Sequence, residues 1–167
     1  AGSLDMDILQ NFSENIGVFY PLQTFSFEKE INWENTPLFI EANSDKNLKE
    51  LTKLANKISK KVTVCSSENR RNIHISAVFV CNFANHMYAI GEKLMQDANL
   101  SFDMLLPLIN ETSKKVNTVS PKLAQTGPAV RYDRNVIDKH LAALSNEPNL
   151  QEIYQLLTEN IHKFATE

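Results

Sequence analysis

Glycine is scarce in this sequence of 167 residues, with four in all and no two in one loop. Average usage would give about a dozen glycines in a chain of this length. A glycine-rich loop brings backbone N–H groups close to the phosphates of a nucleotide, and no segment here can form one. The Walker, G-x-S-x-G and H-E-x-x-H motifs are also missing, which argues against a self-contained hydrolase or zinc enzyme.

Cysteine and histidine are too few and too scattered to form a metal or disulfide framework. The two cysteines, Cys65 and Cys81, are sixteen residues apart and form no C-x-x-C motif. His74 and His86 are twelve apart, which is not the i, i+4 spacing of two helical metal ligands. We therefore expect no metal site, and the thiols favour a reducing, cytoplasmic location.

An excess of positive charge is also absent, since the formal net charge is −3. Nucleic-acid binding depends on clustered Lys and Arg, so we expect no nucleic-acid partner. No apolar run approaches the ~20 residues of a membrane span, and the first residues lack the features of a signal peptide. The sequence therefore predicts no membrane partner.

The composition that is present, 43% hydrophobic and 22% charged, is typical of a globular protein. Before residue 66 the pattern predicts short strands at 17–20, 37–42 and 62–65, with a helix over 47–60. Strand, helix and strand in this order form a βαβ unit, which needs a larger sheet to bury it. Residues 1–66 are therefore predicted to be the tail of an α/β domain.

After residue 66 the apolar periodicity predicts only helices. Ser66 or Ser67 caps a helix of about thirty residues, longer than the average helix. A helix is expected after Ser101, with a bend at Pro107. A short helix is expected to begin at Ser120-Pro121 and to end at Gly127-Pro128, and two more are expected to begin at Asp133 and after Pro148. Residues 67–167 are predicted to form an all-α bundle of about five helices.

The long helix is apolar on all sides over residues 77–81, as expected for a helix enclosed by others. At 100° per residue, one line of side chains along this helix is mostly polar and comprises His74, Cys81, Asn85, Tyr88 and Glu92. Asn82 and His86 form an i, i+4 pair beside this line. Two interpretations remain open. These groups form a hydrogen-bonded core or subunit interface, or they form the polar wall of a substrate cleft in which His74 gives or takes a proton.

Two turns also allow two interpretations each. The segment 125–133 could bind an anion through Arg131, or Gly127 and Asp133 could serve only as helix caps, with Arg131 paired to Asp133 or a neighbour. Residues 21–25 follow a predicted strand at its carboxyl end, where ligands of open α/β sheets bind, or they form an ordinary loop.

These segments together resemble a bacterial family of Rossmann-like oxidoreductases, in which an NADP-binding domain precedes a helical domain of unknown function. The resemblance covers essentially the whole chain and extends distantly to pyrroline-5-carboxylate reductase and to the 6-phosphogluconate and β-hydroxyacid dehydrogenases. It rests on four segments, Ala1-Gly2-Ser3, Tyr20-Pro21-Leu22-Gln23-Thr24-Phe25, a long-helix pattern from Glu68 to Met87, and Thr126-Gly127-Pro128-x-x-Arg131-x-Asp133.

The resemblance implies that Ala1 follows a Rossmann strand and that the glycine-rich cofactor loop precedes this chain, which does not begin with Met. The helical part would resemble the C-terminal domain of 6-phosphogluconate dehydrogenase and form a homodimer. NADP would be the cofactor, with a small molecule as substrate. The implied residues are Pro21, Leu22, Gln23 and Thr24 at the cofactor, His74 and Asn82 in catalysis, and Asn85, Thr126, Gly127, Arg131 and Asp133 at the substrate.

One departure from the relatives affects the chemistry. The hydroxyacid dehydrogenases have a catalytic Lys one turn before an Asn, and if Asn82 matches that Asn, the Lys position is Val78. A valine cannot transfer a proton, so His74 is the candidate that remains. The sequence thus predicts the C-terminal part of an NADP-dependent oxidoreductase, or alternatively a non-catalytic dimerisation or nucleotide-sensing module. A cleft lined by His74 and Asn82 would favour the enzyme.

Overall fold

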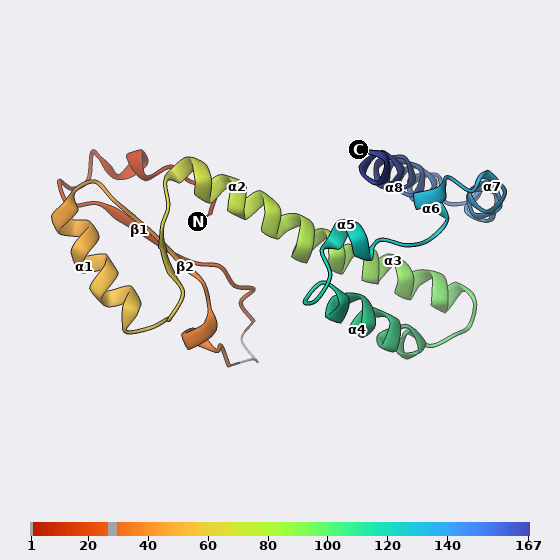
Figure 1. The fold of residues 1–167 in the computed structure, drawn as a ribbon, viewed down its shortest axis with the longest axis horizontal. Helices are drawn as coiled ribbons and strands as arrows, with labels where there is room; N and C mark the ends of the chain where they lie inside the picture. Colours follow the sequence, from red (N-terminus) through yellow and green to blue (C-terminus); the bar gives the residue numbers. More distant parts are fainter. Residues whose placement is uncertain (1, 27–29) are drawn as a thin grey trace. The chain divides into compact units, whose positions relative to one another are not determined.

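The computed structural model describes residues 2–26 and 30–167, which form the elements drawn in Figure 1. Ala1, the first residue of the Ala-Gly-Ser segment, lies outside the described residues. The chain forms two compact units, Ala1–Leu94 and Met95–Glu167. We call these unit 1 and unit 2.

Unit 1 contains a three-stranded sheet in the order β1-β2-β3, made of β1 (Gly17–Pro21), β2 (Leu38–Ala42) and β3 (Val62–Val64). The strands β2 and β3 are parallel and joined by α1 (Asp45–Asn56), so the predicted βαβ unit is present. The strand β1 is antiparallel to β2, with Tyr20 opposite Phe39. Its carboxyl end therefore lies where β2 begins, away from the carboxyl ends of β2 and β3. Two 3₁₀ turns, Met6–Leu9 and Trp33–Asn35, flank β1 and β2.

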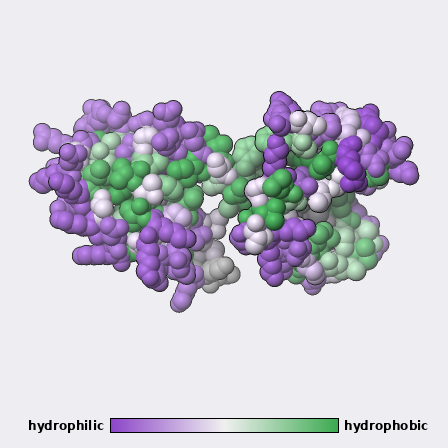
Figure 2. Space-filling model, in the orientation of Figure 1, coloured by the Kyte–Doolittle hydropathy of each residue, from purple (hydrophilic) through white to green (hydrophobic). Residues whose placement is uncertain are grey.

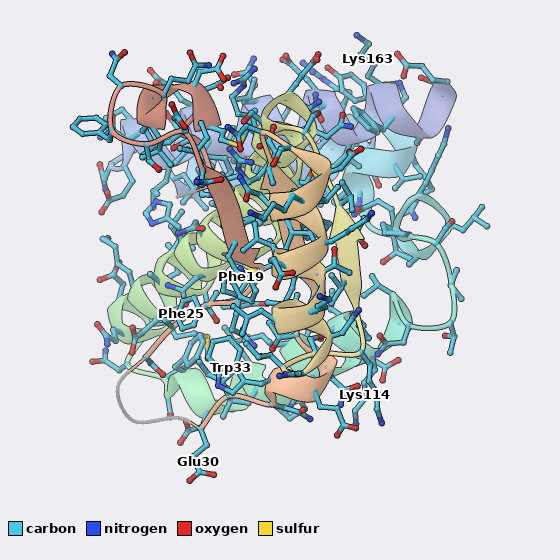
Figure 3. The ribbon with its side chains drawn as sticks, turned by 90° about the vertical axis from the view of Figure 1, so that its left-hand side faces the viewer. Phe19, Phe25, Glu30, Trp33, Lys114 and Lys163 are labelled. Carbon is cyan, nitrogen blue, oxygen red and sulfur yellow. The ribbon has the colours of Figure 1, made fainter. Side chains whose placement is uncertain are left out.

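One face of the sheet carries the hydrophobic core. Leu38 and Ile40 point to this face because side chains alternate along a strand, and both are fully buried against Ala55 of α1. Figure 1 shows α1 lying along the strands, and Figure 3 shows Phe19 beside this helix. Ser44 begins α1 by accepting a hydrogen bond from the backbone N–H of Asn47 at 3.2 Å.

The long helix runs from Ser67 to Asp97 without a break, over 31 residues. It consists of α2 (Ser67–Ala77), a π-helical segment (Val78–Phe83) and α3 (Ala84–Asp97). Ser66 caps it, with its hydroxyl accepting a hydrogen bond from the N–H of Asn69 at 3.2 Å. The predicted start and length are thus confirmed, whereas the π-helical segment is new.

The middle of this helix is not enclosed by other described residues, so that prediction is wrong. None of the residues in the π-helical segment is buried, and Phe79 and Val80 are 63% and 72% exposed. Figure 2 shows hydrophobic residues on the visible face of unit 1 among hydrophilic ones. The apolar side chains of this segment are therefore largely exposed.

The same helix is long and apolar enough to cross a membrane by length and composition, contrary to the expectation that no run is. Its most apolar window of 18 residues has a mean hydropathy of 1.2. The helix nevertheless carries Asn82, Asn85 and His86, whose polar side chains are expensive to place in hydrocarbon. Its first turns are also bonded to the sheet of unit 1. One helix of this kind is weak evidence for a membrane.

The division into units falls at Leu94 and Met95, at the end of the long helix, whereas the sequence predicts a boundary at 66 and 67. The helix groups with the sheet because its first turns are bonded to the strands. Ser67 and Arg70 are hydrogen-bonded to Glu41 of β2, and His74 is hydrogen-bonded to Tyr20 of β1. A change of residue pattern marks the start of the helix but carries no information about these bonds.

Unit 2 is helical, as predicted. Its elements are the 3₁₀ turn Phe102–Leu105 and α4 (Leu106–Lys115), α5 (Pro121–Ala124), α6 (Pro128–Arg131), α7 (Arg134–Ala143) and α8 (Pro148–Thr166). Pro107 lies in the first turn of α4, where its missing N–H costs nothing, so the predicted bend is wrong. Pro128 likewise begins α6. His140 of α7 and Tyr154 of α8 are joined by a hydrogen bond of 2.7 Å.

Candidate functional site

A cavity of about 720 Å³ lies in unit 1, between the loop that follows β1 and the long helix. Seven of its lining residues, including Tyr20, have polar side chains that can donate or accept hydrogen bonds, and the others are apolar or carry a thiol. The lining consists of Tyr20, Leu22, Gln23, Thr24, Phe39, Asn72, Ile73, His74, Ser76, Ala77, Val78, Val80, Cys81 and Asn82. None of these residues is an Asp, Glu, Lys or Arg. The cavity therefore suits an uncharged group with hydrogen-bonding atoms.

His74 reaches the cavity from the second turn of α2 and is hydrogen-bonded to Tyr20. The phenol oxygen of Tyr20 lies 3.3 Å from Nδ1 of His74, and the rings meet edge to face with centroids 6.5 Å apart. Both side chains are partly buried. The bond joins the strand β1 to the long helix at the wall of the cavity.

Asn82 lines the same cavity, although it lies off the polar line predicted from His74. Eight residues separate the two, which is two α-helical turns plus about one residue. A π-helical turn takes about one residue more than an α-helical turn. The π-helical segment absorbs this residue and brings Asn82 back in line with His74.

Asn85 is not among the residues that line the cavity, which corrects the predicted line of polar side chains. The prediction assumed 100° per residue throughout, and the π-helical segment between His74 and Asn85 breaks that assumption. Asn85 is an exposed residue of α3.

The loop after β1 contributes Leu22, Gln23 and Thr24 to the cavity, whereas Pro21 does not line it and instead ends the strand. The N–H of Leu22 donates to the carbonyl of Pro37 at 2.9 Å, which holds the loop beside the start of β2. The rule about carboxyl ends of parallel strands does not explain this position, because β1 is antiparallel. The pairing of Tyr20 with Phe39 explains it, since both side chains then face the long helix.

The remaining predicted residues belong to unit 2. Gly127 has φ of 104°, which favours glycine, and Asp133 begins α7 by accepting a hydrogen bond from the N–H of Val136 at 3.4 Å. Asp133 is thus the predicted N-cap, whereas Gly127 is the N-cap of α6 and not the predicted C-cap of the helix before it, which is Gln125. Thr126 and Arg131 are exposed.

Sequence reasoning missed three polar residues at this cavity, Tyr20, Asn72 and Ser76. Tyr20 comes directly before the loop that the sequence singles out. Asn72 and Ser76 are four residues apart in the predicted helix and so share a face, but each is two residues from His74, a spacing that predicts a different face of the helix. The hydroxyl of Ser76 donates to the carbonyl of Asn72 at 2.9 Å.

A buried ion pair lies one turn before His74. Arg70 is 1% exposed and donates to Glu41, to Ser67 at 3.0 Å and to the carbonyl of Leu4 at 2.5 Å. Burial raises the pKa of Glu41, but the hydrogen bonds from Ser67 and Arg70 outweigh it and hold that pKa below its ordinary value.

Burial raises the pKa of the Tyr20 phenol, and the nearby charge of Arg70 opposes this only in part. The phenol of Tyr20 is therefore neutral at physiological pH. Within the part of the chain that the structure describes, no group of three or more His, Cys, Asp or Glu side chains could hold a metal ion.

Comparison with known proteins identifies the family. Residues 36–161 match a family described as Domain of unknown function (DUF2520). A crystal structure named "putative NADP oxidoreductase BF3122" from Bacteroides fragilis is 47% identical, with a TM-score of 0.93, over 98% of this chain. This chain spans 63% of that protein's length. No protein with a curated description matches.

A second solved structure shares the fold. The protein TM1727 from Thermotoga maritima is 20% identical, with a TM-score of 0.79, over 99% of this chain and 67% of its own. The resemblance to proteins that contain a helical domain of unknown function is therefore confirmed. By the match over most of its length, the chain belongs to the DUF2520 family.

Proposed function

We propose that this chain is the C-terminal part of an NADP-dependent oxidoreductase that transfers a hydride to or from a small molecule. The observation that carries the proposal is the cavity of unit 1, where the loop 22–24 meets His74 and Asn82 of the long helix. The similarity to a protein named as an NADP oxidoreductase, at 47% identity, supports the choice of cofactor. The helical unit would then correspond to the C-terminal domain of 6-phosphogluconate dehydrogenase.

The described residues fit the nicotinamide of a dinucleotide but not its pyrophosphate. Among the described residues, the cavity lining has no Arg or Lys that could pair with a pyrophosphate, and it contains no glycine. Its apolar surface and the amide and hydroxyl groups of Gln23 and Thr24 suit a nicotinamide ring and its carboxamide. A preceding nucleotide-binding domain would hold the phosphates.

NADP supplies or accepts the hydride when it is bound. The residues of this chain bind and orient the substrate and move one proton. His74 gives the proton to the oxygen or nitrogen of the substrate as that group is reduced, and takes it back in the reverse direction. Asn82, in line with His74, hydrogen-bonds the same polar group. Because the described lining contains no Asp, Glu, Lys or Arg, the reacting part of the substrate is an uncharged carbonyl or imine.

The other proposed substrate residues are Asn85 of unit 1 and Thr126, Gly127, Arg131 and Asp133 of unit 2. Arg131 is the one cation among them, so an anionic part of the substrate would pair with it.

The proposal is tested by titrating the full-length protein with NADPH and with NADH in a calorimeter. We expect saturable binding of NADPH, and loss of turnover of an identified substrate in His74→Ala with NADPH binding retained. No binding of either nucleotide would overturn the proposal. Turnover by His74→Ala at the rate of the unchanged protein would remove His74 from the site.

The alternative is a helical dimerisation or nucleotide-sensing module without catalysis, with which the exposed apolar residues of the long helix are compatible. Phe79, Val80 and Phe83 are 63%, 72% and 49% exposed, which suits an interface with a second copy. NADPH binding with no loss of any activity in His74→Ala would support the alternative. A homodimer is part of both proposals. A cytoplasmic location stays a prediction, consistent with free thiols at Cys65 and Cys81.

A further inference from the structure

Tyr20 and His74 form a hydrogen-bonded pair to which neither the sequence pattern nor the family assigns a role. The pair joins two segments 54 residues apart in the chain, and both side chains line the cavity. Tyr20 also lies near Phe39, with ring centroids 6.4 Å apart. The phenol is thus held by its strand and by packing.

Gly2 closes one side of this pair. It is buried, and a Cβ atom at this position would lie 2.7 Å from Nδ1 of His74 and 2.8 Å from the phenol oxygen of Tyr20. Atoms do not approach so closely, so any larger residue would push the two side chains apart. Three segments, the N-terminal segment, β1 and α2, therefore meet at the bond between Tyr20 and His74.

The two ring nitrogens of His74 differ in their surroundings. Nδ1 is bonded to Tyr20, whereas no hydrogen bond from residues 2–26 or 30–167 reaches Nε2. A neutral imidazole has one N–H and one acceptor nitrogen, and the bond at one nitrogen decides where the proton sits. A group that both gives and takes a proton at Nε2 needs its other proton to stay on Nδ1, because otherwise the loss of a proton from Nε2 would leave an imidazolate.

We propose that Tyr20 is a positioning residue that accepts a hydrogen bond from Nδ1–H of His74 and thereby leaves Nε2 free to exchange a proton with the substrate. The proposal rests on the proposed function for its chemistry, but its geometry does not depend on a cofactor. In the reducing direction, the imidazolium of His74 gives its Nε2 proton to the substrate and remains neutral with the proton on Nδ1. In the oxidising direction, Nε2 takes that proton back.

The phenol suits this role because it stays neutral. Arg70, one turn before His74, is the charged side chain that acts on the phenol, and Glu41 of β2 is bonded to Arg70. In the part of the chain that the structure describes, no Asp, Glu, Lys or Arg lines the cavity itself. A neutral phenol orients the imidazole without fixing it in the charged state, so His74 can change its protonation during turnover.

The first test reads the protonation of the ring directly, by ¹⁵N NMR of histidine-labelled full-length protein at a pH where His74 is neutral. His74→Gln identifies the signals. We expect the unchanged protein to carry the proton on Nδ1 of His74, and Tyr20→Phe to move it to Nε2, the form preferred in water. A proton on Nε2 in the unchanged protein, or on Nδ1 in both, would overturn the proposal. This result is independent of whether NADPH binds.

The second test measures catalysis once a substrate is known. General acid–base catalysis contributes roughly 10²- to 10⁴-fold, and misplacing the acid loses part of it, so we expect Tyr20→Phe to lower kcat about 10-fold with little change in KM. An unchanged kcat would overturn the proposal.

The chain offers a matched control and a second variant. Tyr154→Phe removes the comparable phenol bond to His140 in unit 2, and should alter the proton position on His140 but neither His74 nor turnover. Gly2→Ala leaves every hydrogen-bonding group in place but crowds the pair, and should reproduce the NMR change of Tyr20→Phe. If Gly2→Ala leaves the tautomer of His74 unchanged, the close approach of Gly2 does not position the pair.

Discussion

Arg70 is the residue on which the attachment of the long helix to unit 1 depends most. Its guanidinium is 1% exposed and bonds to β2, to the first turn of α2 and to the N-terminal segment through Glu41, Ser67 and Leu4. Its Nε has no hydrogen-bond partner among the described residues. His74 follows one turn later, so the position of the cavity wall depends on this ion pair.

We expect Arg70→Met to lower the free energy of unfolding by about 3–5 kcal/mol, because it leaves the Glu41 carboxylate in a largely buried place without its cation. Urea denaturation measures this. Arg71→Met is the matched control, since Arg71 pairs with Asp5 at 3.2 Å on the surface, with side chains 43% and 45% exposed. The control should cost less than about 1 kcal/mol. Equal losses in the two variants would contradict the assignment.

The same pair gives stability a defined dependence on pH. Because the pKa of Glu41 is held below its ordinary value, its contribution is complete above that ordinary value and is lost as the pH falls through the lowered one. Glu41→Gln should remove this part of the acid dependence in urea denaturation at a series of pH values.

For single helices and strands, the sequence predicts the features that follow from residue types and their spacing. It does not predict the features that depend on contacts with other elements. The capping serine, the start of the long helix and its length follow from residue types and spacing. The π-helical segment does not, because the choice between α- and π-helical turns depends on packing around the helix. The direction of β1 was also not fixed by its residues, since a strand of this pattern fits either orientation.

The π-helical segment leads to a prediction about deletions. Removing Val80 from this segment allows an α-helical turn to form there, so the side chains before and after it should stay on the same sides of the helix as in the unchanged protein. Removing Ile75 from α2 instead rotates everything after it by about 100° relative to Tyr20 and Glu41. Both residues are exposed, at 72% and 55%, so their loss removes similar contacts.

At a protein concentration low enough to keep the unchanged protein monomeric, we expect the deletion of Val80 to keep the midpoint of urea unfolding close to that of the unchanged protein and to retain the Nδ1 tautomer of His74. The deletion of Ile75 should lower the midpoint and abolish binding of any ligand in the cavity. If the two deletions are equally harmful, the π-helical segment does not serve to keep the faces of the helix in line.

At the scale of the whole molecule, the sequence predicts an α/β part and a helical part, and both are present. The boundary between compact units differs, because it depends on the bonds of Ser67, Arg70 and His74 to the strands, which no pattern of apolar residues reveals. The candidate site was likewise predictable only in part. His74, Asn82 and the loop 22–24 could be predicted to line a cleft, but Tyr20 could not, since it acts through a contact between distant segments.

The exposed apolar residues of the long helix lead to a prediction for the assembly. If a second copy covers Phe79 and Val80, folding and association are coupled, and the thermal midpoint rises with protein concentration. Burying one such side chain contributes about 1.5–3 kcal/mol, so Phe79→Ser with Val80→Ser should shift the protein toward monomer in sedimentation equilibrium and remove the concentration dependence. Leu123→Ser is the control, because Leu123 is 78% exposed and belongs to α5 of unit 2. A monomer at all concentrations in the unchanged protein would contradict the proposed homodimer.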